Sequence, residues 1–126
     1  MFIISFLIVC LEGCTQKQND NEILKKGSVL FAKYGCFLCH SFDGSVIYGP
    51  PLNDFFLKDI KIIRQGQELT VVANRKYLKR AIAEPRYEEV AGYQNKAMPQ
   101  TFLSKKDVDI LVDYIIAVNK QNNVGN

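Results

Sequence analysis

The stretch Cys36-Phe37-Leu38-Cys39-His40 decides how the rest of this chain is interpreted. Two cysteines separated by two residues and followed directly by histidine form the attachment pattern of a c-type haem. In that chemistry the two thiols add across the vinyl groups of the porphyrin, and the adjacent imidazole binds the iron from one side. His40 is the single histidine of the chain, so no other residue can supply that imidazole. We therefore expect Cys36 and Cys39 to carry a covalent haem and His40 to bind its iron.

The first residues have the features of an export signal. Residues 2–11 are apolar, and this run is too short to cross a bilayer of ~30 Å as a helix. The segment that follows, Leu11-Glu12-Gly13-Cys14, resembles the lipobox of bacterial lipoproteins. We interpret residues 1–13 as a lipoprotein-type signal peptide and Cys14 as the lipidated residue. Plain secretion and an uncleaved anchor are the alternatives.

The remaining chain divides into a tether, one domain and a tail. Residues 14–21 are polar and are expected to form a flexible tether. Residues 22–120 have the patterning of a folded domain, and residues 121–126 are expected to be a disordered tail. The mature protein would be exported and lipid-anchored on the periplasmic or cell-surface side of a bacterial membrane. Covalent haem attachment is normally completed in that location.

Composition and cysteine usage agree with a small exported domain. The chain has 126 residues, of which 48% are hydrophobic and 23% charged, as in ordinary globular proteins. Its formal charge of +3 is mild and no basic cluster occurs, so we expect no nucleic-acid partner. Cys10 would leave with the signal and Cys14 would carry lipid. Because the other two cysteines belong to the haem motif, none is left for a structural disulfide.

Three helices are expected from periodicity and end signals. Ile23, Gly27 and Phe31 lie on one face of a helix that begins after Asp20 or Asn21 and ends at Gly35, as a helix-terminating glycine does. A second helix runs from Arg75 to Ala83, after the N-cap Asn74 and before Pro85. The last helix has Ser104 as its cap, Asp107 three residues on, and the apolar stripe Val108, Leu111, Val112, Ile115 and Val118.

These helices predict an all-α domain of three to five short helices around one covalently bound haem. The N-terminal and C-terminal helices could cross, with Gly27 allowing close approach, or each could cover a separate part of the core. The segment from Phe55 to Ile60 suggests a further short helix, and Gly66 marks a turn. Residues 69–72 are the one short stretch with β propensity.

Two loops contain residues suited to complete a haem site. Met98, followed by Pro99, is the single methionine of the mature chain, and its thioether is a potential sixth iron ligand. A lone methionine is more often core filler, but beside this motif the ligand role is favoured. Gly49-Pro50-Pro51-Leu52 could present a carbonyl to the second nitrogen of His40, or it could be a surface turn.

The whole stretch from Ile23 to Val118 resembles a class I cytochrome c, and is most similar to the cytochrome c domain fused to subunit II of bacterial haem–copper oxidases. The resemblance includes the haem motif itself and the Gly49-Pro50-Pro51-Leu52 loop. It also includes Tyr77-Leu78 with Ile82 and Pro85, and Gly92-Tyr93-Gln94-Asn95 with Met98-Pro99. The copper-binding domain of those oxidases has no counterpart in this sequence, so the fold and ligands carry over while membership of an oxidase does not.

The resemblance implies a role for each matching residue. Cys36 and Cys39 would hold haem c, and His40 and Met98 would bind its iron. The carbonyl of Pro50 would accept a hydrogen bond from His40, and Leu52 would pack on the ring. Tyr93 and Asn95 would line the methionine side, although the loop from Tyr93 to Met98 is one residue longer than usual.

The expected function is single-electron transfer between redox proteins, with no catalytic residue and no small-molecule substrate. Partners would be a terminal oxidase, a dehydrogenase or a reductase of a respiratory chain, met alone or within a complex. A haem enzyme or gas sensor in which Met98 dissociates is one alternative. A thioredoxin-like dithiol or a zinc site at Cys36 and Cys39 is another, but the βαβ setting and the second ligand cluster that these need are not evident in the sequence.

Overall fold

The computed structural model describes residues 12–125, with side chains from Lys17 onward. The predicted signal peptide lies almost entirely outside this range, and the side chain of Cys14 lies outside it too. The elements are α1 (Glu12–Lys33), the 3₁₀ turn η1 (Cys36–Leu38), β1 (Asp59–Arg64), β2 (Gln67–Val72), α2 (Arg75–Ala83), β3 (Glu89–Val90) and α3 (Lys105–Val124). Within the described range, no helix combines the length and apolar character needed to cross a membrane.

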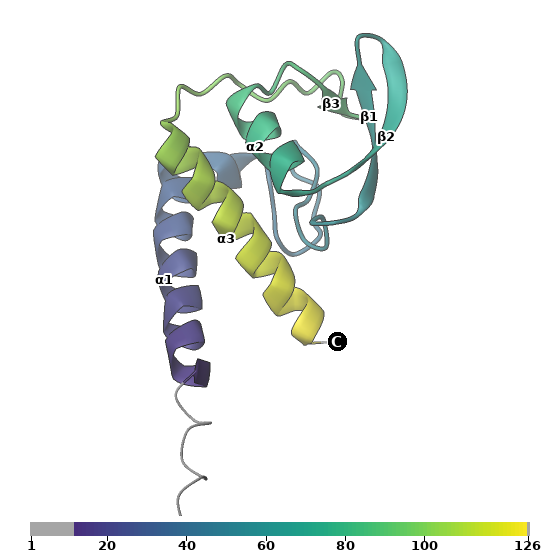
Figure 1. Ribbon diagram of the computed structural model, residues 1–126. Helices are drawn as coiled ribbons and strands as arrows, with labels where there is room; N and C mark the ends of the chain where they lie inside the picture. Colours follow the sequence, from purple (N-terminus) through teal and green to yellow (C-terminus); the bar gives the residue numbers. More distant parts are fainter. Residues whose placement is uncertain (1–11, 126) are drawn as a thin grey trace, which may run out of the picture.

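The two long helices α1 and α3 cross and form one side of the molecule (Figure 1). A Cβ atom at Gly27 would overlap the side chain of Tyr114, so only glycine permits this approach. The rings of Phe31 and Tyr114 pack beside it, with centroids 5.5 Å apart. The predicted crossing of the terminal helices is confirmed.

The extents of α1 and α3 differ from expectation at both ends of the domain. Helix α1 begins at Glu12, so residues 14–21, expected as a flexible tether, are helical. The capping role given to Asp20 or Asn21 is therefore wrong. Helix α3 continues to Val124 and includes most of the expected tail. Residues 17–21 of α1 and 121–124 of α3 are exposed, and they add turns to helices that packing in the domain already stabilises.

A small antiparallel sheet makes the all-α prediction wrong in one part of the chain. Its strands are ordered β2-β1-β3, and Ile62 of the central strand is completely buried. A two-residue turn joins β1 to β2, with φ of 50° at Gln65 and 78° at Gly66. Two successive positive φ values are the mark of a tight hairpin whose twist matches that of the strands. The turn at Gly66 and the strand over residues 69–72 agree with expectation.

The short helix expected from Phe55 to Ile60 is absent, and the chain there turns and enters β1 instead. Positive φ values of 51° at Asp54 and 64° at Leu57 are incompatible with a helix. The backbone N–H groups of Phe55 and Phe56 donate to Asn119 Oδ1 of α3, at 2.7 and 3.0 Å. A side chain distant in sequence therefore satisfies these donors.

The predicted limits of α2 and the start of α3 are confirmed. Asn74 Oδ1 accepts from the backbone N–H of Tyr77 at 2.9 Å, and Ser104 Oγ accepts from that of Asp107 at 3.0 Å. Both helices contribute to a single hydrophobic core that also contains α1 and β1. Its buried members are Phe31, Leu52, Ile62, Ala73, Tyr77, Leu78, Ile82, Val108, Leu111, Val112, Tyr114, Ile115 and Ile116.

Candidate functional site

The two motif cysteines lie on one short turn at the end of α1. Gly35, with a φ of 72°, ends the helix and turns the chain into η1. The backbone N–H groups of Cys39 and His40 both donate to the carbonyl of Cys36, at 3.2 and 3.0 Å. Residues three apart share a face of such a turn, so both thiols border the same pocket. The two cysteines are free, and burial raises the pKa of the Cys36 thiol.

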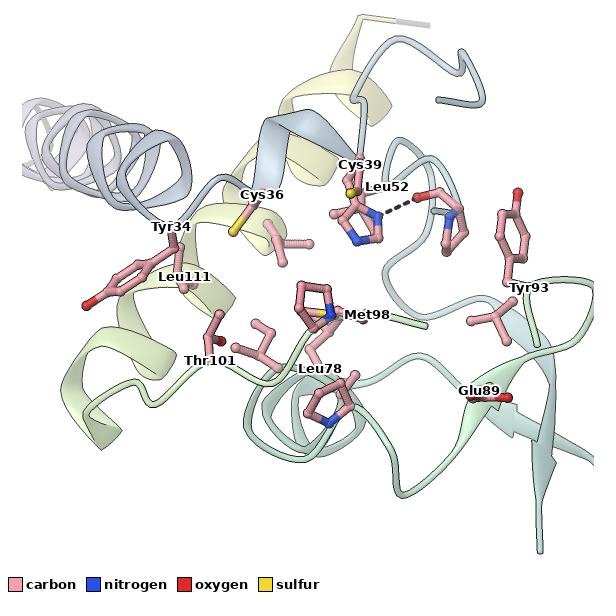
Figure 2. Close-up of a pocket in the computed structure, with 18 of the residues that line it drawn as sticks. Tyr34, Cys36, Cys39, Leu52, Leu78, Glu89, Tyr93, Met98, Thr101 and Leu111 are labelled. Atoms are coloured by element: carbon pink, nitrogen blue, oxygen red, sulfur yellow. Dashed lines mark hydrogen bonds between the residues drawn. The ribbon is translucent and has the colours of Figure 1, made fainter. Parts of the chain in front are cut away.

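The ring of His40 is fixed by the loop that follows the motif. Its Nδ1 lies 2.8 Å from the carbonyl oxygen of Pro50, drawn as the dashed line in Figure 2. Since a carbonyl can only accept, Nδ1 carries the proton and Nε2 presents a lone pair. Burial lowers the pKa of His40, with an opposing contribution from the Pro50 hydrogen bond. The imidazole is therefore held neutral and oriented, as a metal-binding histidine must be.

Gly49 is required beside this ring. A Cβ atom at that position would lie 2.6 Å from His40 Cε1, which is an impossible contact. Two backbone hydrogen bonds hold the loop against the motif, from Gly49 N to Cys39 O at 2.9 Å and from Leu52 N to Ser41 O at 2.8 Å. The loop is thus part of the site and not a free surface turn.

Met98 lies across the pocket from the cysteines (Figure 2). It belongs to the chain between β3 and α3, which has no helix or strand of its own. Gln100 Nε2 donates to the carbonyl of Ala83 at 2.9 Å and ties this segment to the end of α2. Leu78 of α2 and Thr101 also border the pocket near this side.

The pocket brings together most of the residues singled out in the sequence. Those that line it are Cys36, Cys39, His40, Pro50, Leu52, Tyr93 and Met98, joined by core residues such as Leu78, Ile82 and Leu111. Asn95 is exposed and is not among the lining residues.

Two buried polar residues near the pocket were not anticipated. Glu88 lines the pocket and is bound by Arg64 and Arg80, although the charged run around it resembles a solvated surface. Asn119 lies four residues after Ile115 and so continues the apolar stripe of α3. This position in the sequence could have indicated that its side chain is buried. Burial, together with the charge of Glu88, raises the pKa of Tyr77, another lining residue, to about 12.

The donor set fits a c-type haem. A mostly apolar pocket has two free thiols at one wall, an oriented imidazole beside them and a thioether opposite. In the described part of the chain, no three His, Cys, Asp or Glu side chains converge on a metal site. A family model described as Cytochrome c matches residues 24–119. The chain belongs to the cytochrome c family. A search of the curated proteins found no match.

Family membership establishes the cofactor and the general activity. Cytochromes c carry haem c covalently, and this chain is an electron carrier and not a catalytic enzyme. When bound, the haem supplies a one-electron Fe(II)/Fe(III) couple. The protein's own residues offer two free thiols for attachment, an apolar enclosure, and a hydrogen bond that orients the His40 ring.

Proposed function

We propose that this cytochrome c is a monohaem electron carrier whose iron is bound by His40 Nε2 and Met98 Sδ. The observation that carries the proposal is the hydrogen bond from His40 Nδ1 to the carbonyl of Pro50, which leaves the lone pair of Nε2 available to bind iron. Met98 supports it from the opposite side, because it borders the same pocket on a different segment. A thioether ligand raises the reduction potential and gives low-spin iron, which suits rapid electron transfer.

Absorption spectroscopy of the purified protein and two variants tests these ligands. The oxidised wild-type protein should be low-spin, with a weak methionine–iron band in the far red. Met98→Ala should lose that band and become high-spin, while Lys96→Ala, two residues away and also at the pocket, should keep it. A high-spin native protein, or an unchanged Met98→Ala spectrum, would contradict the assignment. Rapid CO binding by the reduced wild-type protein would instead favour a haem enzyme or gas sensor.

We further propose that the protein works at the outer face of a bacterial membrane, held by lipid on Cys14. The supporting feature is the lipobox-like segment before that cysteine. In a bacterial expression host, the wild-type protein should fractionate with membranes and incorporate labelled fatty acid. Cys14→Ser should do neither. Equal release of both proteins into the soluble extracellular or periplasmic fraction would favour plain secretion.

A terminal oxidase of a respiratory chain is the proposed electron acceptor, with a dehydrogenase or another reductase as the next candidate. Support comes from the resemblance to domains fused to oxidase subunit II, including the loop Gly49–Leu52. Reduced protein mixed with membranes of the producing bacterium should be reoxidised in the presence of oxygen. Millimolar cyanide, which blocks haem–copper oxidases, should stop the reaction. Cyanide-insensitive reoxidation would point to a different acceptor.

A further inference from the structure

A buried charge cluster lies against the wall of the pocket. The side chain of Glu88 is 1% exposed and is bound by two arginines from different elements, Arg64 of β1 and Arg80 of α2. Arg64 Nε donates to one carboxylate oxygen and Arg80 Nε to the other, each at 2.9 Å. Both guanidiniums add a second, shorter hydrogen bond to the same oxygens. Each arginine therefore makes a two-pronged contact, and both carboxylate oxygens are used.

The ring of Tyr87 packs against both guanidiniums of this cluster. It lies 5.3 Å from the guanidinium carbon of Arg64 and 4.7 Å from that of Arg80, within the range of cation–π attraction. The arginine side chains are 28% and 26% exposed. Charges removed from water in this way are weakly screened by solvent and salt.

The charges of the cluster lie close to the pocket, because Glu88 itself is one of the lining residues. Two guanidiniums and one carboxylate leave it with one net positive charge. The other charged side chains lining the pocket are Glu89 and Lys96, which are more exposed and so better screened. Sequestered charge at the wall is therefore concentrated in a single group of residues.

We propose that the charges of the Arg64–Glu88–Arg80 cluster set part of the reduction potential of the haem. The inference rests on the proposed electron-carrier function. Oxidation adds one positive charge at the iron, so a nearby negative charge favours Fe(III) and a nearby positive charge favours Fe(II). The negative charge of Glu88 lowers the reduction potential. Glu88 also holds the two arginines in place, and their positive charges raise the potential.

Potentiometric titration of charge-changing variants tests the proposal. Glu88→Gln keeps the shape of the side chain and removes its negative charge, so the midpoint potential should rise. Arg80→Gln and Arg64→Gln each remove one positive charge, so the potential should fall. Arg80→Lys keeps the charge but loses the two-pronged contact, and should lower the unfolding temperature with little change in potential.

Asp109→Asn is the matched control. It changes the formal charge by the same amount as Glu88→Gln, but Asp109 is 49% exposed, pairs with Lys79 on the surface and does not line the pocket. Its potential should equal that of the wild-type protein. If Glu88→Gln does not fold, the two arginine-to-glutamine variants decide the question by the sign of their shift.

Two patterns would overturn the proposal: shifts no larger than that of the control, or shifts of the same sign for removal of either charge. The second pattern, or an Arg80→Lys shift as large as that of Arg80→Gln, would mean that the cluster has a structural role alone. The absorption spectrum keeps this outcome separate from the fate of the proposed function. If the midpoint potentials of the variants do not change but all spectra are low-spin, the assignment of His40 and Met98 as ligands still stands. A high-spin wild-type protein would refute that assignment directly.

Discussion

Asn119 joins parts of the chain that are more than 60 residues apart. Its side-chain amide accepts two hydrogen bonds and donates two. Its Oδ1 accepts from the backbone of Phe55 and Phe56, which are 64 and 63 residues away in sequence. Its Nδ2 donates to the carbonyls of Leu52 and Ile115, at 2.9 and 2.8 Å. The residue is only 1% exposed, so water cannot replace these partners. Because Leu52 lines the pocket, this amide holds one wall of the haem site in place.

Replacing Asn119 should therefore be costly. Asn119→Leu keeps a similar volume but removes the side-chain partner of two backbone donors and two backbone acceptors, at a cost of about 3 kcal/mol. Denaturant unfolding measures this loss. Asn122→Leu, at an exposed position on the same helix, should change the free energy of unfolding by no more than about 0.5 kcal/mol. Equal effects at the two positions would show that the amide network does not stabilise the fold.

The spacing of residues along the chain determines which parts of the site could be predicted from sequence. His40, Gly49 and Pro50 lie within ten residues, and each belongs to a short motif with its own chemical reason. Glu88 gives no such signal, since its two arginine partners are 24 and 8 residues away and the fold alone brings them together. Asn95 was expected beside Met98 from the resemblance alone, and in the structure it is exposed and does not line the pocket.

At the scale of the elements, the crossing of α1 and α3 depends on one glycine. A glycine in the middle of a helix is unfavourable by about 1 kcal/mol relative to alanine. Here that cost is offset by the close approach of Tyr114, whose Cβ and ring occupy the space of a side chain at position 27. Helix propensity and packing therefore make opposite predictions for the same substitution.

Gly27→Ala should destabilise the protein by about 1–3 kcal/mol, as overpacking of a tight core contact does. Thermal or denaturant unfolding gives the sign directly. Val29→Ala, at an exposed position of the same helix, should be close to neutral or slightly stabilising. A Gly27→Ala protein more stable than the wild type would mean that propensity outweighs packing and that the crossing is looser than described.

The elements that were predicted well carry their signals within a few residues. Helix α2 begins after the cap Asn74 and ends before Pro85 as expected, since both signals act on adjacent backbone groups. The sheet was not predicted. Its central strand β1 has only six residues, which is too short for a clear periodic pattern, and its pairing with β3 joins positions more than 25 residues apart. The turn at Gly66 and the short β-prone stretch over residues 69–72 were evident in advance, because both signals are local.

For the whole molecule, pH dependence at the alkaline end should come in part from Tyr77. Burial and the charge of Glu88 raise its pKa from the ordinary 10.0 to about 12 in the folded state. The neutral phenol is thus favoured by folding, so its contribution is complete below about pH 10 and is lost as the pH rises toward 12. A shift of this size corresponds to about 2–3 kcal/mol.

Unfolding experiments between pH 9 and about pH 12 test this contribution. The wild-type protein should lose stability over that interval more steeply than Tyr77→Phe, which has no phenol to ionise. Phe55→Leu is the control for packing, because the Phe55 ring packs against that of Tyr77, with centroids 6.3 Å apart, and has no group to ionise. Its profile should run parallel to that of the wild type. Parallel profiles for all three proteins would contradict the role of Tyr77.

The haem site as a whole is assembled from both ends and the middle of the domain: thiols and imidazole after α1, an orienting carbonyl in the next loop, and a thioether before α3. The central claim is that Met98 completes it by binding the iron opposite His40. Proton NMR of the reduced protein tests this claim most directly, because the porphyrin ring current shifts the methyl protons of a bound methionine far upfield. We predict one three-proton resonance in that region, absent from Met98→Ala. A reduced protein without it, or a resonance that persists in the variant, would contradict the account.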